Sequence, residues 1–443
     1  MKVFALRVSG CATILAALTL PAMPPAAAAA TYSVIYSFKG GADGASPYGG
    51  LVQSSAGQLF GTTYTGGTGE YGTVFELGQG TSGWEKAVLH NFSGPDGETP
   101  SDTLVFDAAG NLYGTTRWGG ANNGGTVFNL IPPSAPGGPW TQNVLYSMPS
   151  GGCDNLPRGL FGSVLISPSG ALITTSAVTT CTPPSGGTLF LLTPPAQTGG
   201  AWTESTLINF SKASLGSSIF AGVVGRGNSV YGTTWYGGPL VGCGDVYEST
   251  PTPSTGTWTG SLVYAFQGSD GCNSGATLTP GPNGVFYGTT YDGGILGPCI
   301  IPTNGGCGVV FELTPPAAQG GTWTESVLYY FTAANGDGAY PSANVVLGPN
   351  GVLYGTTQYG GSATTGSPCS SNGVSGCGTV FQLTPPTTPG GAWTETILHS
   401  FTGQNGDGSI PMAGLLTASD GTLYGTTSGG GASNKGTVFS IVP

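Results

Sequence analysis

Five aspartates stand at matching places along the sequence, and their carboxylates are the groups that could most readily do chemistry. Each precedes a glycine in a loop that leads into an apolar segment. They are Asp43, Asp96, Asp270, Asp337 and Asp407, with Asp154 in a related place. Together they could hold a cation such as calcium, which takes several oxygen ligands. Asp-Gly is also a common turn pair whose aspartate binds its own backbone. We favour independent turns and expect no bound cofactor.

The sequence has 2 histidines, and both occupy one recurring position. Where His90 and His399 stand, other copies of the same segment have Tyr36, Tyr146, Ile208, Tyr264 and Tyr329. A position that accepts Tyr, His and Ile indicates packing rather than catalysis. No nucleophile elbow, phosphate-binding loop, histidine metal motif or Ser/His/Asp set is readable. The sequence therefore predicts no catalytic residue and no metal ligand.

Aromatic residues that follow a recurring YGTT phrase form a second candidate surface. They are Tyr64, Trp118, Trp235, Tyr236, Tyr291 and Tyr359. Exposed rings beside carboxylates commonly hold sugars by stacking and hydrogen bonds. Alternate residues of a strand point to opposite faces, so Tyr64, Trp235 and Tyr291 share one direction while the other three share the opposite one. We therefore expect several of these rings to pack in the core. The candidate ligand-binding residues are the five aspartates with Trp118, Trp235, Tyr236, Tyr291 and Tyr359.

The cysteines predict disulfides. Of the 9 in the chain, Cys11 lies in a leader-like segment, which leaves an even number. An even count in an exported chain favours crosslinks over metal clusters. Two pairs recur at the same spacing in adjacent units, so we predict Cys299–Cys307 and Cys369–Cys377 as local bonds. We predict Cys153–Cys181 and Cys243–Cys272 as the remaining pairs.

Residues 1–30 read as a secretory signal peptide. Lys2 and Arg7 precede an apolar run and a group of small residues, so we expect cleavage after Ala30. A lipoprotein-like box at Val8–Cys11 is an alternative, but Arg7 interrupts the apolar region that would have to precede Cys11. We expect a protein without a membrane span that is secreted, periplasmic or extracellular.

The composition limits the partners. Charged residues are 7% of the chain and the net charge is −11, so little is available to neutralise phosphates. We therefore exclude nucleic acid and expect a monomer that binds a glycan or a protein. Glycine and proline number 82 and 34, yet hydrophobic residues are 38%, which suffices for packed cores.

Internal repeats define the elements that must position these residues. The YGTT phrase occurs near Leu59, Leu112, Val230, Phe286, Leu353 and Leu423, with a degraded copy, LITTS, at Leu172. GTVF-like, Trp-containing and turn-bounded apolar segments accompany it. Each is short, β-branched or aromatic, and bounded by turn residues, as strands are. Four such segments in each of seven units predict an all-β fold: a seven-bladed β-propeller of four-stranded blades, spanning residues 31–443 as one domain.

Two details of the repeats carry further predictions. The last unit ends at GTVFSIVP without its Trp-containing strand, and residues 31–38, TYSVIYSF, match that missing strand. We therefore predict that the N-terminal strand completes the last blade and removes an open edge. The glycine inside each YGTT strand predicts that a ring or a neighbouring sheet approaches the backbone closely.

The alternation of YGTT-x-x-GG, GTVF and W-x-x-x-x-L-x-x-F resembles the GloVer repeat of bacterial choice-of-anchor tandem repeat proteins, over essentially all of residues 31–443. The unit around Leu172 departs most, because it lacks the Tyr-Gly pair and the paired glycines. The resemblance implies an exported bacterial repeat protein and brings no activity or catalytic residue. Members often carry a C-terminal anchor, and the sequence up to Pro443 gives no support for one.

Two functions remain open at this level. The first, which we favour, is an exported non-enzymatic propeller that binds a glycan or protein ligand on one loop face. The second is an extracellular hydrolase or lyase with an acidic, calcium-dependent site on the axis. A surface-layer role would need an anchor or self-association that the sequence does not show. An enzyme should break the sevenfold symmetry with a deep pocket of clustered carboxylates, whereas a scaffold should keep a shallow ring.

Overall fold

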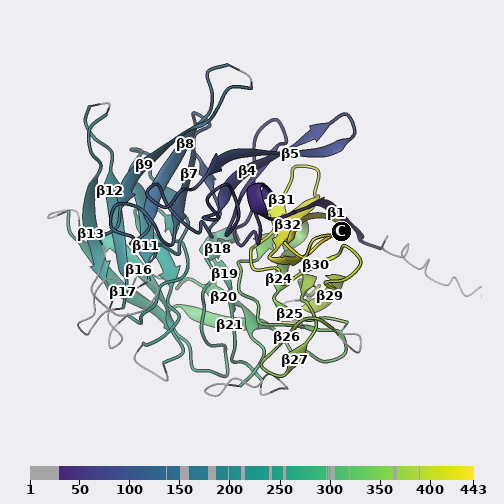
Figure 1. Cartoon of the computed structure of the whole chain (residues 1–443). Helices are drawn as coiled ribbons and strands as arrows, with labels where there is room; N and C mark the ends of the chain where they lie inside the picture. Colours follow the sequence, from purple (N-terminus) through teal and green to yellow (C-terminus); the bar gives the residue numbers. More distant parts are fainter. Residues whose placement is uncertain are drawn as a thin grey trace, which may run out of the picture.

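Seven antiparallel four-stranded sheets follow one another in chain order around a central axis in the computed structural model (Figure 1). The structure describes residues 29–135, 137–149, 159–177, 186–197, 199–210, 215–238, 242–252, 256–295, 297, 299, 305–318, 320–362, 367–388 and 390–443. The predicted seven-bladed propeller is confirmed. The predicted leader lies almost wholly outside the described residues, and so does Asp154.

Each blade repeats the same four strands. The inner strands are β2 (Val52–Gln53), β6 (Val105–Phe106), β10 (Leu165–Ile166), β14 (Val224–Arg226), β18 (Thr279–Pro280), β23 (Val346–Leu347) and β31 (Leu416–Thr417). The second strands, which carry the YGTT phrase, are β3 (Leu59–Thr63), β7 (Leu112–Thr116), β11 (Leu172–Ser176), β15 (Ser229–Thr233), β19 (Phe286–Thr290), β24 (Leu353–Thr357) and β32 (Leu423–Thr427).

The outer half of each blade is longer. The third strands are β4 (Thr73–Gly80), β8 (Thr126–Ile131), β12 (Thr188–Thr193), β16 (Asp245–Pro251), β20 (Val309–Thr314), β28 (Thr379–Thr384) and β34 (Thr437–Val442). The fourth strands are β5 (Gly83–Asn91), β9 (Thr141–Ser147), β13 (Thr203–Asn209), β17 (Trp258–Ala265), β21 (Thr324–Tyr330), β29 (Thr394–Ser400) and β1 (Thr31–Ser37).

Short accessory elements occur in the loops. Three two-stranded ribbons pair β22 (Gly338–Ala339) with β25 (Tyr359–Gly360), β26 (Ser370–Ser371) with β27 (Val374–Ser375), and β30 (Gly408–Ser409) with β33 (Gly429–Gly430). The helical elements in the described part of the chain are the 3₁₀ turns η1 (Gly41–Asp43), η2 (Pro282–Gly284) and η3 (Pro349–Gly351). None of the described helices is long and apolar enough to cross a membrane.

The N-terminal strand closes the ring as predicted. β1 pairs antiparallel with β34, with Thr31 opposite Val442 and Ser37 opposite Thr437. The last sheet therefore has the order β1-β34-β32-β31, which joins both ends of the chain in one blade (Figure 1). Because backbone hydrogen bonds join β1 to β34 within the last blade, β34 presents no unpaired edge.

The glycine of each YGTT strand faces an aromatic ring on the neighbouring strand. In β24, Gly355 lies directly opposite Phe381 of β28, and a Cβ on the glycine would meet the Phe381 ring at 2.5 Å. The same arrangement occurs at Gly61, Gly114, Gly232, Gly288 and Gly425. The ring thus lies across the glycine backbone inside its own sheet, which is the close approach that the sequence predicted.

The first threonine of each YGTT phrase, or Thr175 at the equivalent place in LITTS, ties its blade to the next one. Its hydroxyl donates to a backbone carbonyl at the start of the following blade's inner strand. These bonds run from Thr62 to Asp102, Thr115 to Gly162, Thr175 to Ala221, Thr233 to Ala276, Thr289 to Ala343, Thr356 to Ala413 and Thr426 to Gly49, at 2.8–3.5 Å. This ring of hydrogen bonds holds the segment that enters each inner strand against the axis.

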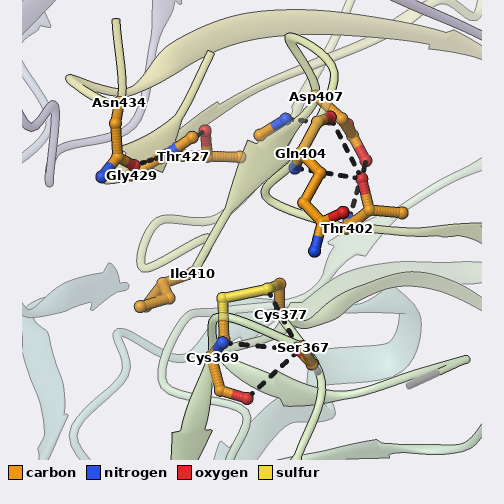
Figure 2. The surroundings of a disulfide bond; sticks show 12 residues. Ser367, Cys369, Cys377, Thr402, Gln404, Asp407, Ile410, Thr427, Gly429 and Asn434 are labelled. Carbon is orange, nitrogen blue, oxygen red and sulfur yellow. Dashed lines mark hydrogen bonds between the residues drawn. A yellow bond between two sulfur atoms is a disulfide. The ribbon is translucent and has the colours of Figure 1, made fainter. Parts of the chain in front are cut away.

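Three of the predicted disulfides are present. Cys299–Cys307 and Cys369–Cys377 are local bonds across a separation of 8 residues, and Cys243–Cys272 joins two loops of neighbouring units. Figure 2 shows Cys369–Cys377 beside Ser367, whose hydroxyl donates to the Cys369 carbonyl at 3.3 Å. The fourth predicted pair, Cys153–Cys181, lies outside the described residues.

Candidate functional site

A cavity of about 490 Å³ lies on the propeller axis. Its wall is built mainly from the short segments that enter the seven inner strands, so every blade contributes to it. These segments are residues 48–50, 101–103, 161 and 163, 220–222, 275–277, 342–344 and 412–414. Because the interblade threonine bonds hold these segments in place, the cavity follows from the fold itself and not from one particular loop.

Asp102 breaks the sevenfold pattern of this wall. The six equivalent positions hold small residues: Gly49, Gly162, Ala221, Ala276, Ala343 and Ala413. Oδ2 of Asp102 is shielded from solvent and has no hydrogen-bond partner in the described part of the chain. Burial raises the pKa of this carboxyl to about 7, and the positive charge of Arg117 opposes the shift. Asp102 therefore lines the axial cavity as an acidic residue with one shielded oxygen that lacks a hydrogen-bond partner.

Arg117 also lines the cavity, and it is held rigidly. Its Nε donates to Ser101 Oγ at 2.8 Å. Its guanidinium carbon lies 4.4 Å from the Phe161 ring centroid and 5.4 Å from that of Tyr64. Among the residues that the structure describes, Arg117 forms no ion pair with Asp102, although the two charges influence each other. The cavity thus contains one cation and one carboxyl that do not neutralise each other by direct contact.

Aromatic rings continue around the axis from Phe161. Phe161 and Phe220 meet edge to face at 5.1 Å, and Phe220 meets Trp235 edge to face at 5.6 Å. Trp235 then contacts Tyr291 at 5.3 Å. All four rings line the cavity. They come from the third, fourth and fifth blades, so this part of the wall is apolar and continuous.

Tyrosines extend this series of rings beyond Tyr291, and a separate pair lies at Tyr48 and Tyr64. Tyr291 stacks on Tyr340 at 4.9 Å, and Tyr340 meets Tyr359 edge to face at 6.2 Å. Tyr48 stacks on Tyr64 at 4.5 Å. Burial, together with the nearby Tyr64 and Tyr359 phenols, raises the pKa of Tyr48, so this ring lies within electrostatic range of both neighbours. We call these rings the aromatic collar: Tyr48, Tyr64, Phe161, Phe220, Trp235, Tyr291, Tyr340 and Tyr359.

Strand parity alone does not separate the aromatic residues proposed from sequence. Trp235 and Tyr291 line the cavity, and Tyr64 packs behind Tyr48. Tyr359 belongs to the collar through Tyr340 without lining the cavity. Trp118 and Tyr236 are not among the lining residues, and Tyr236 is 50% exposed. A ligand-binding role for any of them stays a prediction.

The five aspartates of the Asp-Gly loops each fold back on their own loop. In each of them, one carboxylate oxygen accepts a hydrogen bond from the backbone N–H of a residue three to five positions earlier in the chain. The bonds are Lys39 to Asp43, Ser93 to Asp96, Gln267 to Asp270, Thr332 to Asp337 and Thr402 to Asp407. Figure 2 shows this arrangement for Asp407, with Thr402 and Gln404 in the same turn. Each carboxylate therefore organises its own turn.

The recurring Tyr/His position on the fourth strands anchors four of these loops. The donors to the aspartates are Tyr36 to Asp43, His90 to Asp96, Tyr264 to Asp270 and His399 to Asp407. The rings of His90 and His399 also pack edge to face on phenylalanine. Both histidines thus hold a loop as well as pack. Within the described chain, no three His, Cys, Asp or Glu side chains converge in a way that could hold a metal ion.

Five residues of the cavity wall were missed in the sequence, namely Tyr48, Asp102, Arg117, Phe161 and Phe220. Asp102 and Arg117 did carry a signal. Asp102 is the one acidic residue at a position that is otherwise Gly or Ala, and Arg117 directly follows YGTT, where other units have Tyr64, Trp235 or Tyr291. Aligning the seven units position by position, rather than searching for clusters of acids, would have singled out both.

Solved structures with a related arrangement belong to proteins of different kinds. A proposed 6-phosphogluconolactonase from Bacteroides uniformis is 13% identical, with 84% of this chain and 88% of that chain covered and a TM-score of 0.48. The extracellular domains 1–2 of Drosophila Semaphorin 1a are 9% identical (91% and 87% covered, TM-score 0.46). A PL25 ulvan lyase is 11% identical (86% and 96% covered, TM-score 0.42). None of these similarities is close enough to carry an argument about function.

The sequence itself matches a repeat family. A comparison with curated proteins found no matching relative. The family model described as the Gloeobacter/Verrucomicrobia repeat matches residues 22–157 and 161–368, which is most of the chain. The matched region contains the first six YGTT-type strands and all four strands of the first five blades. The chain therefore belongs to the Gloeobacter/Verrucomicrobia (GloVer) repeat family.

Proposed function

We propose that this protein binds a saccharide in its axial cavity and does so outside the cytoplasm. The observation that carries the proposal is the group of collar rings that line the cavity, together with a carboxyl and a guanidinium that form no ion pair with each other. Sugar rings have apolar faces that stack on aromatic side chains and hydroxyl edges that bond to polar groups. Trp235 and Tyr291 supply the first kind of contact, and the Asp102 carboxyl, which also lines the cavity, supplies an acceptor of the second kind.

The size of the cavity suits such a ligand. Its volume of about 490 Å³ falls within the range of roughly 300–1,000 Å³ that is usual for small-molecule sites. One or two sugar residues could enter, with the rest of a glycan outside. The ligand would then be recognised by its end, because the strand-entry segments of the seven blades enclose the cavity from the sides.

Binding is better supported than hydrolysis. Glycoside hydrolysis commonly uses two carboxyl groups on either side of the scissile bond. Asp102 is the one carboxyl among the described residues that line the cavity. The five loop aspartates accept hydrogen bonds in their own turns, so their carboxylates already have partners. We therefore favour a binding protein over the acidic hydrolase or lyase.

The crosslinks support an exported location. Disulfides persist in oxidising compartments and are rare in the cytosol. Three occur in the described loops, and the sequence begins with a segment of signal-peptide character. We propose that the mature protein is secreted or resides in the periplasm or at the cell exterior.

A glycan-array screen followed by titration calorimetry with the best binder tests the proposed function. Trp235→Ala should weaken that binding by about tenfold or more, because it removes a stacking surface from the cavity wall. Tyr236→Ser is the matched control: it removes the adjacent ring, which is half exposed and does not line the cavity. Thermal unfolding of each variant checks that it remains folded.

Two results would argue against the axial cavity as the site. One is binding that survives Trp235→Ala but is lost with Tyr236→Ser, since the ligand would then contact the outer loop face. The other is a protein that binds no saccharide on the array although it unfolds cooperatively.

A further inference from the structure

We infer that the ligand of the axial cavity is an acidic sugar whose carboxylate is bound by the guanidinium of Arg117. The inference rests on the proposed function, because it names the class of saccharide that the same site would take. The inference comes from the contacts that hold the Arg117 side chain and from the guanidinium nitrogens that have no hydrogen-bond partner in the described chain.

Arg117 is positioned before any ligand arrives. The Phe161 and Tyr64 rings lie close to its guanidinium, and its Nε is bonded to Ser101. Contacts of this kind restrict the rotamers of a long side chain, so less entropy is lost when a ligand binds. Nε is the one guanidinium nitrogen that has a hydrogen-bond partner in the described chain. The two terminal nitrogens can therefore donate to a ligand in the cavity. A planar pair of N–H groups matches a carboxylate in bidentate geometry.

The nearby acid limits what that anion can be. Asp102 lies close enough to Arg117 for their charges to interact, but it forms no ion pair with it. A doubly charged phosphate on Arg117 would be repelled by an ionised Asp102. A singly charged carboxylate on a sugar ring fits better, because the neighbouring ring hydroxyls can donate to the Asp102 carboxyl, which lines the same cavity.

The same two residues would give the ligand one orientation in a nearly sevenfold cavity. At the position after YGTT, other blades have the uncharged Tyr64, Trp235, Tyr291, Gln358 and Ser428. Arg117 and Asp102 come from adjacent segments of one unit, and both line the cavity. The cavity wall is therefore charged in one of the seven directions around the axis and differs there from the other six. A sugar with its acid group on one carbon would therefore bind in a single pose, stacked on the aromatic collar.

Titration calorimetry with simple sugars tests this inference. The probes are D-glucuronate, D-galacturonate and D-mannuronate, the matching neutral hexoses glucose, galactose and mannose, and galactose 6-sulfate. We expect at least one uronate to bind about 10- to 100-fold more tightly than its neutral hexose, as a charged bidentate hydrogen bond predicts. Arg117→Gln should abolish that preference, and Arg117→Lys should restore only part of it because lysine lacks the planar fork.

Arg226→Gln is the matched control, because Arg226 also lies over two aromatic rings, those of Phe286 and Trp323, but does not line the cavity. It should leave the preference for uronates unchanged. A preference that survives Arg117→Gln would overturn the assignment to Arg117. A sulfated sugar that binds more tightly than every uronate would overturn the assignment of a carboxylate.

The outcomes also separate this inference from the function on which it rests. If neutral hexoses bind as tightly as uronates and Trp235→Ala weakens both, saccharide binding holds and the acidic-sugar inference fails. If neither these probes nor any sugar on the array binds to the folded protein, both fail.

Discussion

Tyr247 makes the fourth blade differ from the other six by one hydroxyl group. Phenylalanine occupies the same position elsewhere, at Phe75, Phe128, Phe190, Phe311, Phe381 and Phe439. In the fourth blade the tyrosine ring lies over Gly232 in the same way. Its hydroxyl is fully buried and has no hydrogen-bond partner in the described chain, and burial raises the pKa of the phenol far above its usual value. The ring is needed there and the hydroxyl is not.

We therefore predict that Tyr247→Phe stabilises the protein, by about 1–2 kcal/mol, because it removes a buried polar group that lacks a partner. Chemical denaturation at equilibrium measures the change. Tyr231→Phe is the control in the same blade: the Tyr231 hydroxyl donates to Glu248 at 2.7 Å, so its loss should give no such gain. A Tyr247→Phe protein that is less stable than the wild type would show that the hydroxyl has a partner in solution.

At the scale of strands, the fourth strand reaches the aspartate loop of the preceding blade in three places. The residue two places after the Trp makes this contact in these blades: Lys86 toward Asp43, Glu325 toward Asp270 and Glu395 toward Asp337. Lys86 forms an ion pair with Asp43 at 3.1 Å, whereas the two glutamates bring a second acid to an acid. The same interblade contact thus joins opposite charges in one pair of blades and two carboxyl groups in two others.

Glu395 on β29 gives this contact a pH dependence. Burial first, and then the charge of Asp337, raise the pKa of Glu395 to about 8, even though the Tyr329 hydroxyl donates to it at 2.9 Å. A carboxyl whose folded pKa lies above its unfolded value of 4.5 contributes stability that is full below pH 4.5 and is lost as pH rises through about 8.

We predict that the melting temperature of the wild type falls between about pH 5 and pH 9 and that Glu395→Gln makes this fall shallower. Glu85→Gln, at an exposed position on β5, should leave the slope unchanged. Scanning calorimetry across this pH range measures the dependence of melting temperature on pH. Equal slopes for the wild type and Glu395→Gln would show that Glu395 ionises normally in the fold.

At the scale of the whole molecule, the ring depends on one strand that is distant in sequence. β1 supplies the outer strand of the last blade, and Tyr32 adds side-chain contacts there: it stacks on His399 at 3.6 Å, and its hydroxyl donates to Asp407 at 2.7 Å. Tyr32 thereby binds the loop of the sixth blade's outer strand as well as β34. The N-terminal strand holds two adjacent blades together.

We predict that deleting residues 31–39 gives an aggregation-prone or unfolded protein, because the edge of β34 and the apolar face under β1 become exposed. Size-exclusion chromatography and thermal unfolding measure both effects. Tyr32→Phe, which keeps the strand and loses only the bond to Asp407, should remain monomeric. A truncated protein that stayed monomeric with unchanged melting temperature would contradict this closure.

The sequence by itself determined the strands, the number of blades, the closing strand and the local disulfides. Each of these rests on short-range information. Turn residues bound every strand, YGTT and GTVF recur in register, and Cys299–Cys307 and Cys369–Cys377 lie within single loops. Such signals are visible along the chain because the interacting residues are a few positions apart or repeat at equivalent places in each unit.

The candidate site was decided by tertiary structure. Asp102 and Arg117 look like isolated charges in the sequence, and they share a cavity only because the ring of blades brings seven strand-entry segments to one axis. The Asp-Gly aspartates repeat more conspicuously, yet each carboxylate bonds within its own turn. The repeat pattern reports what all blades need in order to fold, whereas the site depends on the position where one blade differs and on what lies across the axis from it.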